Sequence, residues 1–459
     1  MKIKPSLAKG TRDFNSIQLY KRNYIIEKIK DSFLKFGFNP IETPSFERSS
    51  TLLGKYGEEG DRLIFKILRS GNFLKELDKN DFLDGDTAKI ASKISDKALR
   101  YDLTVPFARY VVQNQNKINL PFKRFQIQPV WRADRPQRGR FREFLQCDAD
   151  VIGSKSLFQE IEFIQLFDKI FESLNLNGTV IKINSRKILI GLSEILGCTD
   201  KFRDLTIALD KIDKIGIDSI GKELESKEFT EKSIDTIKEL ISFTGDFDKT
   251  ISFLKSKFNN STIGLEGISD IEFIYSAIKN LGLKSSDLTF DLSLARGIDY
   301  YTGLIFEVSA PKTVSIGSLA GGGRYDNLTE IFGLSNISGI GVSFGLDRIY
   351  MVLEELNLFP NIQGNIVKAL FLNFGDENSL YSMNAMDKLR ENNISTELYP
   401  DNLSIKKQLN YANNNNIPYV VFVGDEELKS KKYNLKEMNT GNQELLTISQ
   451  LIKKLTEQK

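Results

Sequence analysis

Residues 122–153 read FKRFQIQPVWRADRPQRGRFREFLQCDADVIG, and this stretch decides which fold the sequence predicts. Two runs rich in aromatic and β-branched residues, 122–131 and 144–152, flank a segment that holds Pro136 and Gly139. Strand-forming runs on either side of a turn with Pro and Gly are typical of a β-hairpin. We therefore expect an antiparallel sheet in this part of the chain.

The same hairpin is strongly basic. Between residues 122 and 142 there is one acid, Asp134, and there are seven basic residues: Lys123, Arg124, Arg132, Arg135, Arg138, Arg140 and Arg142. Guanidinium groups bind phosphate oxygens through paired hydrogen bonds, so the hairpin is a candidate polyphosphate site. A solvated basic loop is the alternative for the arginines near the turn. It fits Arg132 less well, because alternation with Val130 and Trp131 directs this side chain inward.

The amino-acid composition limits the kinds of catalytic and metal site that the chain can contain. The chain has 459 residues, 41% apolar and 27% charged, which indicates a globular protein of two or three domains. Its formal net charge of +2 excludes a uniformly basic surface. It contains no histidine, which excludes histidine general bases, histidine-activated nucleophiles and histidine metal ligands. The two cysteines, Cys147 and Cys198, lack the spacing of a metal site.

Nothing in the sequence predicts a membrane or secreted location. No apolar run is long enough to span a bilayer. The segment from Met1 to Thr11 lacks the apolar region of a secretory signal. We therefore expect a cytoplasmic protein without membrane association.

The hydrophobic pattern predicts a mixed α/β (α+β) chain of two domains. In the first, 1–360, we expect helices at 18–36, 156–174 and 345–356, and strands at 101–110, 122–131, 144–152, 288–295, 304–309 and 339–344. From about 186 to 285, apolar residues recur at helical spacing, which predicts a helical insertion. The second domain, 365–459, is a small α/β domain with strands expected at 367–374, 396–399 and 419–423 and helices at 379–392 and 403–413.

Four further segments carry candidate functional residues. Residues 294–303 (LARGIDYYTG) end a strand with Arg296 before a Tyr-Tyr pair. Residues 321–326 (GGGRYD) are expected to form a turn whose glycines let the backbone approach a ligand. Residues 339–348 (GIGVSFGLDR) pass through Gly345, which leaves room for a flat ring, to Arg348 near a helix start. Residues 99–106 (LRYDLTVP) place Asp102 and Thr104 on one face of a strand, where they suit an ammonium group.

Each of these segments also has a purely structural interpretation. Arg296 can pair with Asp299 in a hairpin turn, and Arg348 can pair with Asp347 or Glu354 on a helix surface. Asp102 suits a cross-strand ion pair, and glycine runs are often only turns. The spacing alone leaves these alternatives open.

Taken together and in this order, the segments resemble the histidyl-tRNA synthetases, a family of class II aminoacyl-tRNA synthetases. Residues 9–14 (KGTRDF) are similar to the family's opening, Pro44 to the dimer-interface proline of motif 1, residues 131–144 to motif 2 and residues 345–348 to motif 3. The segments with Arg296 and Tyr325 resemble the pair that sets the histidine enzymes apart from other class II members. The resemblance covers nearly the whole chain. It implies an antiparallel-sheet catalytic domain over 1–360 and an anticodon-binding domain over 365–459.

The resemblance implies ATP-dependent activation of histidine to histidyl-adenylate and its transfer to the 3′ end of tRNA(His). It implies that histidine is bound by Asp102, Leu103, Thr104, Gln146, Asp150, Tyr300, Tyr301 and Tyr325. It implies that ATP is bound by Arg132, Arg140, Gly345 and Arg348. Asp102 and Thr104 are expected to hold the α-ammonium group, while Asp150 and the tyrosines line the imidazole pocket. Arg132 and Arg296 are the expected catalytic residues, on opposite sides of the α-phosphate.

This chemistry needs no histidine side chain. The substrate carboxylate is already an anion when it attacks the α-phosphorus of ATP and expels pyrophosphate. Alignment and neutralisation of charge remain to be supplied, and arginines with Mg²⁺ supply both. We therefore expect ATP and Mg²⁺ as cofactors, and histidine, tRNA(His) and a second copy of the chain, in a homodimer, as partners.

Two other functions share this fold. A histidyl-synthetase-like regulatory subunit of ATP phosphoribosyltransferase would bind histidine without being an enzyme, but such paralogues usually lack the C-terminal module and often the arginine at position 296. Another class II synthetase, for proline, threonine or glycine, is disfavoured by the segments with Arg296 and Tyr325.

The C-terminal region is not broadly basic, since residues 361–459 hold 12 Lys plus Arg and 12 Asp plus Glu. A local cluster of Lys429, Lys431, Lys432 and Lys436 suits phosphate contacts or a solvated hairpin.

Overall fold

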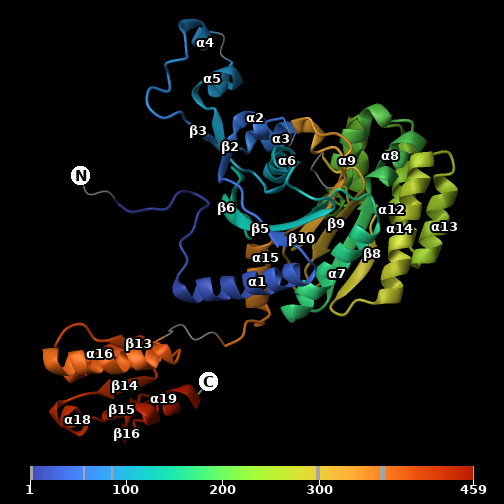
Figure 1. The fold of residues 1–459 in the computed structure, drawn as a ribbon. Coiled ribbons are helices and arrows are strands. Elements are labelled where there is room, and N and C mark those ends of the chain that lie inside the picture. The colour runs from blue at the N-terminus through green and yellow to red at the C-terminus, as the bar shows by residue number, and fades with distance from the viewer. Residues whose placement is uncertain (1–3, 55–56, 84–85, 296–299, 362–366, 458–459) are drawn as a thin grey trace. The chain divides into compact units, whose positions relative to one another are not determined.

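The structure is a computed structural model that describes residues 4–54, 57–83, 86–295, 300–361 and 367–457. Within these residues the chain forms two compact units (Figure 1). The first runs to Phe14 and from Gln18 to Phe359, and the second comprises Asn15–Ile17 and the chain from Pro360 onward. Each unit has hydrophobic cores of its own.

The first unit is built on an eight-stranded sheet in the order β1-β5-β6-β11-β10-β9-β7-β8. Its strands are β1 (Asn39–Pro40), β5 (Phe122–Trp131), β6 (Glu143–Ile152), β7 (Thr179–Ser185), β8 (Ser286–Phe290), β9 (Leu304–Ser309), β10 (Ala320–Tyr325) and β11 (Gly339–Gly345). Neighbouring strands run antiparallel except for the outermost pairs, β1 with β5 and β7 with β8. The antiparallel sheet expected from the sequence is confirmed.

Helices α1 (Ser16–Lys35) and α7 (Phe158–Ser173) cover one face of this sheet. Their aromatic side chains meet those of the strands: the Phe33 ring centroid lies 5.5 Å from that of Phe125 and 5.9 Å from that of Phe344. Phe167 of α7 lies 5.3 Å from Phe344. Because side chains alternate along a strand, this apolar layer leaves the opposite face free to carry polar residues.

Two smaller substructures flank the sheet. Strands β2 (Phe46–Arg48), β3 (Lys66–Ile67) and β4 (Lys97–Leu99) form a second sheet, near helices α2 (Ser49–Leu52), α3 (Gly57–Arg62) and α6 (Thr104–Gln113). Between β3 and β4 the chain leaves the body of the unit as an arm with α4 (Lys79–Leu83) and α5 (Thr87–Ile94) (Figure 1).

The segment expected to be helical is a group of helices beside the sheet, green to yellow in Figure 1. They are α8 (Arg186–Ile195), α9 (Phe202–Leu209), α10 (Ile212–Ile215), α11 (Ile217–Ser226), α12 (Glu231–Ser242), α13 (Phe247–Lys257) and α14 (Thr262–Leu281). Helices α8 and α14 cross closely, since a Cβ on Gly191 would lie 2.5 Å from Gly264 Cα. Helix α15 (Leu346–Glu355) follows β11, as expected.

The second unit is a five-stranded sheet with helices. The order is β13-β12-β14-β15-β16, with β12 parallel to both of its neighbours and the last two pairs antiparallel. The strands are β12 (Ala369–Phe371), β13 (Thr396–Leu398), β14 (Tyr419–Phe422), β15 (Tyr433–Glu437) and β16 (Gln443–Leu446). The helices are α16 (Asp376–Glu391), α17 (Ile405–Asn414), α18 (Asp425–Ser430) and α19 (Ile448–Glu457). The sequence predicted β12–β14 with α16 and α17, and it did not predict the elements after β14.

Two local predictions are wrong. Residues 101–110 were expected as a strand, but α6 begins at Thr104, where Asp102 Oδ1 accepts a hydrogen bond of 3.1 Å from Val105 N. The β-branched and aromatic residues form the buried side of a helix, and Pro106 lies in its first turn, where proline is tolerated. Residues 321–326 were expected as a turn, but they belong mainly to β10. Glycine is needed there because a Cβ on Gly322 would lie 2.0 Å from Gly341 O.

Within the described part of the chain, no helix combines the length and the hydropathy needed to cross a membrane.

Candidate functional site

Three strands place polar and small residues in register on the sheet face opposite α1 and α7. Because side chains alternate along a strand, residues two apart share a face. Across β5, β6 and β11, the register brings together three rows: Arg124, Asp150 and Gly341; Gln126, Asp148 and Ser343; Gln128, Gln146 and Gly345. The side chains of β5 and β6 supply the polar groups, and the glycines of β11 leave space above them.

A cavity of about 310 Å³ opens over this face. Of the residues that the sequence assigned to the substrates, it is lined by Asp102, Thr104, Arg132, Arg140, Gln146, Tyr300, Tyr301, Tyr325, Gly345 and Arg348. These residues come from five separate segments of the chain. Leu103 and Asp150 do not line the cavity, and Arg296 lies outside the described residues.

Asp150 lies behind the cavity wall in an ion pair. Its Oδ2 is 2.7 Å from Arg124 Nη2, and its Oδ1 accepts a hydrogen bond of 2.5 Å from the Tyr325 hydroxyl. Burial raises the pKa of Asp150, while Arg124 opposes the rise. A Cβ on Gly341 would lie 1.9 Å from Asp150 Oδ1, so only glycine fits beside this carboxylate. Leu103 contributes its carbonyl oxygen, which accepts a hydrogen bond of 3.2 Å from Arg124 Nη2.

The carboxylate that does line the cavity from this face is Asp148, which the sequence analysis did not single out. It is 2% exposed, and burial raises its pKa to about 7 against the effect of Arg124. Its Oδ1 has no hydrogen-bond partner among the described residues. The same is true of Gln146 Oε1, whose amide nitrogen donates a hydrogen bond of 3.0 Å to Ser343 Oγ. Two buried acceptors are thus left for a ligand.

A sequence signal for Asp148 exists. Gln146, Asp148 and Asp150 alternate with Cys147 and Ala149, so the three polar residues must share one face of a strand. The resemblance drew attention to the first and the last and passed over the middle one.

Three tyrosines form an aromatic wall. The ring centroids of Tyr300 and Tyr301 are 4.9 Å apart, and Tyr300 meets Tyr325 edge-on at 6.1 Å. Burial raises the pKa values of Tyr300 and Tyr325 well above the ordinary value, so both hydroxyl groups stay protonated near neutral pH. A flat ring can pack against such a wall while its polar atoms face the acids.

Three arginines from different segments line the same cavity. Arg132 Nε donates a hydrogen bond of 3.1 Å to Tyr101 O, and the guanidinium carbon lies 4.2 Å from the centroid of the Tyr101 ring. Arg140 makes two hydrogen bonds of 2.9 Å to Asp134. Arg348 Nη1 donates a hydrogen bond of 2.7 Å to Ser318 O. Their convergence gives the cavity the charge that a polyphosphate needs.

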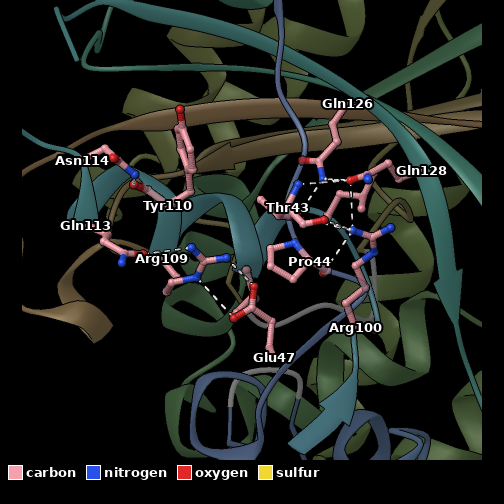
Figure 2. Close-up of polar contacts among 12 residues, drawn as sticks. Thr43, Pro44, Glu47, Arg100, Arg109, Tyr110, Gln113, Asn114, Gln126 and Gln128 are labelled. Carbon is pink, nitrogen blue, oxygen red and sulfur yellow. Dashed lines mark hydrogen bonds and ion pairs between the residues drawn. The ribbon is translucent and has the colours of Figure 1, made fainter. Parts of the chain in front are cut away.

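A buried arginine fixes the segment that carries Asp102. Arg100 Nη1 donates hydrogen bonds to Thr43 O at 2.7 Å and to Gln128 Oε1 at 3.0 Å; Figure 2 draws this network. Arg100 Nε donates to Pro129 O at 2.8 Å, and the Arg100 carbonyl oxygen accepts a hydrogen bond of 3.1 Å from Trp131 N. This network holds the chain just before Asp102 to the end of β5.

No protein-only metal cage is present among the described residues, since no group of three His, Cys, Asp or Glu side chains is arranged so that it could hold a metal ion. The carboxylates that line the cavity beside the arginines are Asp134 and Asp347. Asp347 Oδ1 is taken by Arg12 and Arg22, whereas its Oδ2 has no hydrogen-bond partner in the described part of the chain.

Comparison with known proteins identifies the relatives of the chain. A family profile for histidyl-tRNA synthetase matches residues 72–349, and a profile for an anticodon-binding domain matches residues 368–458. The chain is 56% identical to the histidine–tRNA ligase of Christiangramia forsetii over 98% of this chain and 99% of that protein. It is 55% identical to the histidine–tRNA ligase of Flavobacterium johnsoniae over 96% of this chain and 97% of that protein.

A solved structure agrees with these matches. The crystal structure of the histidyl-tRNA synthetase from Nostoc sp. PCC 7120 superposes with a TM-score of 0.80 at 26% identity, and the match covers 100% of both chains. On the strength of a profile that covers more than half of the sequence, and of relatives more than half identical over almost its full length, this chain belongs to the histidyl-tRNA synthetase family.

Proposed function

We propose that the cavity over β6, β10 and β11 is where this chain joins histidine to ATP. As a member of its family the chain is a histidine–tRNA ligase, which activates histidine and charges tRNA with it. One observation carries the assignment of the site: arginines from separate segments line the same cavity as three tyrosines and two buried acceptors that have no hydrogen-bond partner among the described residues. The cavity therefore suits a ligand with an anionic end and a polar aromatic end.

The activation step needs little from side-chain acid–base chemistry. The histidine carboxylate attacks the α-phosphorus of ATP, the new C–O–P bond forms, and pyrophosphate leaves. In this proposal Arg132 binds the carboxylate and the α-phosphate, and Arg140 and Arg348 bind the outer phosphates. Fixed guanidinium groups stabilise charge on the phosphate oxygens without reorganisation. Asp102 and Thr104 hold the α-ammonium group.

Mg²⁺ fits this cavity as an ion that arrives with the nucleotide. Mg²⁺ in nucleotide sites is usually held by phosphates, waters and one or two carboxylates rather than by a cage of protein ligands. The buried Asp347 Oδ2, which has no hydrogen-bond partner among the described residues, is the oxygen that would hold it. When bound, Mg²⁺ neutralises charge on the phosphates.

Assignments for tRNA binding, assembly and location complete the proposal. The second unit binds the anticodon of tRNA(His), since it coincides with the match to an anticodon-binding domain, and Lys429, Lys431 and Lys432 contact phosphates. The chain acts as a homodimer in the cytoplasm. Its exposed edge strand β1 and the exposed Pro44 form the dimer interface, and light scattering should give twice the chain mass of 52.2 kDa.

Amino-acid-dependent exchange of pyrophosphate into ATP tests the function. We expect exchange with histidine and none with proline, threonine or glycine. No exchange with any amino acid, together with measurable histidine binding, would favour the regulatory subunit of ATP phosphoribosyltransferase. Exchange with a different amino acid would favour another class II synthetase.

Arg296 is proposed as the second catalytic arginine on the family resemblance. Its replacement by alanine should slow adenylate formation by about a hundredfold or more, because a charged hydrogen bond to the transition state is lost, while histidine binding is largely retained. Single-turnover activation measures the rate, and equilibrium dialysis measures the binding. Equal single-turnover rates for Arg296→Ala and the parent would contradict this role.

A further inference from the structure

We propose that Asp148 recognises the imidazole ring of histidine by accepting a hydrogen bond from a ring N–H. The inference rests on the proposed function of the cavity and adds a specificity residue to it. It concerns a side chain to which the family resemblance assigned nothing.

The first argument is that Asp148 is buried, faces the cavity and is incompletely satisfied. It is 2% exposed, it lines the cavity, and its Oδ1 has no hydrogen-bond partner among the described residues. Its neighbour across the register on β5, Gln126, donates instead to Thr43 Oγ1 at 2.8 Å and to Gln128 Oε1 at 2.5 Å. A buried carboxylate oxygen without a donor is costly, and a ligand N–H that enters the cavity removes this cost.

The second argument is that Asp150, two residues away, is already occupied. One of its oxygens accepts the Tyr325 hydroxyl and the other is paired with Arg124. Asp150 does not line the cavity, whereas Asp148 does. In this arrangement Asp150 orients Tyr325, and the acceptor presented to a ligand is Asp148.

The third argument separates the ring from the ammonium group. An amino acid carries its ammonium group next to its carboxylate. Asp102 directly follows Tyr101, whose carbonyl oxygen holds Arg132, so it lies beside the expected carboxylate site. Both Asp102 and Asp148 interact electrostatically with Tyr300 of the aromatic wall. Their places differ, because Asp102 Oδ1 accepts a hydrogen bond from Val105 N at the start of α6, whereas Asp148 lies on β6 two residues before Asp150, which holds the Tyr325 hydroxyl. We therefore assign the ring to Asp148 and the ammonium group to Asp102.

The charged and titratable groups around Asp148 are consistent with this role. They are Arg124 on β5, Asp150 on β6 itself, Asp102 before α6, and Tyr300. On β11 its neighbour is the uncharged Ser343, which forms a hydrogen bond with it. Burial raises the pKa of Asp148 to about 7, and an N–H donor from a ligand favours the carboxylate form that accepts it.

The test compares Asp148→Ala with the parent in pyrophosphate exchange, using histidine and 4-thiazolylalanine. The analogue has a five-membered ring of similar size that carries no N–H. We expect Asp148→Ala to raise the KM for histidine by about 10- to 100-fold, which is the loss of one hydrogen bond to a charged group. The KM for ATP should change by less than about twofold.

The ratio of kcat/KM for histidine to that for 4-thiazolylalanine is the decisive readout. It should fall by at least about tenfold in Asp148→Ala, because only histidine loses a hydrogen bond. A general structural defect would lower both values together. The matched control is Asp168→Asn, a buried aspartate on helix α7 that does not line the cavity and whose carboxylate accepts hydrogen bonds from the backbone of residues 284–286. It should leave the ratio unchanged.

Two results would overturn the inference. One is a histidine KM that is unchanged in Asp148→Ala. The other is a KM for 4-thiazolylalanine that rises as much as the KM for histidine, since this would mean that Asp148 binds the ammonium group, which both amino acids carry. Both results are observed against a parent protein that shows histidine-dependent exchange of pyrophosphate into ATP. A parent protein without this exchange would overturn the proposed function instead, so the two failures can be told apart.

Discussion

Arg12 donates a hydrogen bond of 2.7 Å from Nη2 to Asp347 Oδ1, which joins the N-terminal segment to the start of helix α15. The same guanidinium group lies 3.3 Å from the centroid of the Phe141 ring, in the hairpin loop next to Arg140. Asp347 in turn precedes Arg348. One side chain from the beginning of the chain therefore contacts both segments proposed to bind the phosphates of ATP.

We predict that Arg12→Ala raises the KM for ATP by about tenfold, the cost of losing a charged hydrogen bond. The KM for histidine should change much less, because Arg12 contacts the segments with Arg140 and Arg348 rather than the aromatic wall. Lys21→Ala is the matched control, since Lys21 also forms an ion pair with α15, at 2.5 Å from Glu354. Glu354 does not line the cavity, whereas Asp347 and Phe141, which Arg12 contacts, do. Pyrophosphate exchange at varied ATP measures both. Equal effects of the two substitutions would contradict this prediction.

The substitution Gly341→Ala tests whether the close approach of β11 to Asp150 is needed. A Cβ at this position would lie 1.9 Å from Asp150 Oδ1, so Gly341→Ala must displace the carboxylate from Tyr325 and Arg124. We expect a loss of about 1–3 kcal/mol in the free energy of unfolding, typical of overpacking, and a large fall in histidine-dependent exchange. Urea unfolding followed by the emission of Trp131, the only tryptophan, measures the first.

The control for this substitution is Gly221→Ala in helix α11. A Cβ at Gly221 would meet the flexible side chain of Lys238 at 3.2 Å, and alanine favours a helix over glycine by about 0.5–1 kcal/mol. It should be neutral or slightly stabilising. A Gly341→Ala variant as stable and active as Gly221→Ala would show that Asp150 need not stay where it is.

The sequence predicted elements best where one periodicity dominated. Strand β5 was predicted at its observed limits and α1 within two residues, because each repeats a clear pattern. The strand expected at 101–110 is helix α6, since burial of one helical face suits the same β-branched and aromatic residues that strands prefer. The β10 glycines were taken for a turn because their role, close contact with Gly341, involves a strand that lies later in the chain.

The sequence predicted which segments meet at the cavity, and the roles of their residues stay predictions. The residues assigned to ATP line one cavity, because motif spacing specifies which segments meet. That Asp148 lines the cavity while Asp150 lies behind its wall could not be foreseen, because it depends on Arg124 and Tyr325 reaching Asp150 from other strands. Arg296 falls outside the described residues, so its role stays a prediction.

Arg100 and Arg109 lie in neighbouring networks and should differ in their effect on stability (Figure 2). Arg100 is fully buried, and its removal leaves the carbonyl groups of Thr43 and Pro129 without this donor. We predict that Arg100→Met lowers the free energy of unfolding by about 3 kcal/mol or more, since each unsatisfied buried acceptor costs about 1–3 kcal/mol.

Arg109→Met should cost less, about 1–2 kcal/mol, because it removes the donor of one carboxylate, that of Glu47, and the 22% exposed side chain of Arg109 gives water a path to that carboxylate. Urea unfolding monitored by Trp131 emission compares the two variants directly. If Arg109→Met proved as damaging as Arg100→Met, the Arg100 network would not be the stronger support of this segment.

Asp148 should also make stability depend on pH. Burial raises the pKa of Asp148 from 3.8 to about 7 in the folded chain, so between these values the folded chain keeps a proton that the unfolded chain has released. Linkage then requires the free energy of unfolding to fall as the pH rises through this window. The asparagine of Asp148→Asn cannot ionise, so this variant does not lose stability in this way. Its free energy of unfolding should rise relative to that of the parent by up to about 4 kcal/mol between about pH 4 and about pH 8.

Asp246 provides a control of opposite sign for this pH dependence. The backbone N–H of Lys249 lowers the pKa of Asp246, so its contribution to stability is present above the ordinary pKa and is lost as the pH falls. As the pH rises, the free energy of unfolding of Asp246→Asn should therefore fall relative to that of the parent, whereas that of Asp148→Asn should rise. Urea unfolding at a series of pH values gives both differences. A flat difference for Asp148→Asn would mean that Asp148 is already ionised in the folded chain near pH 4, which its burial beside Asp150 and Asp102 argues against.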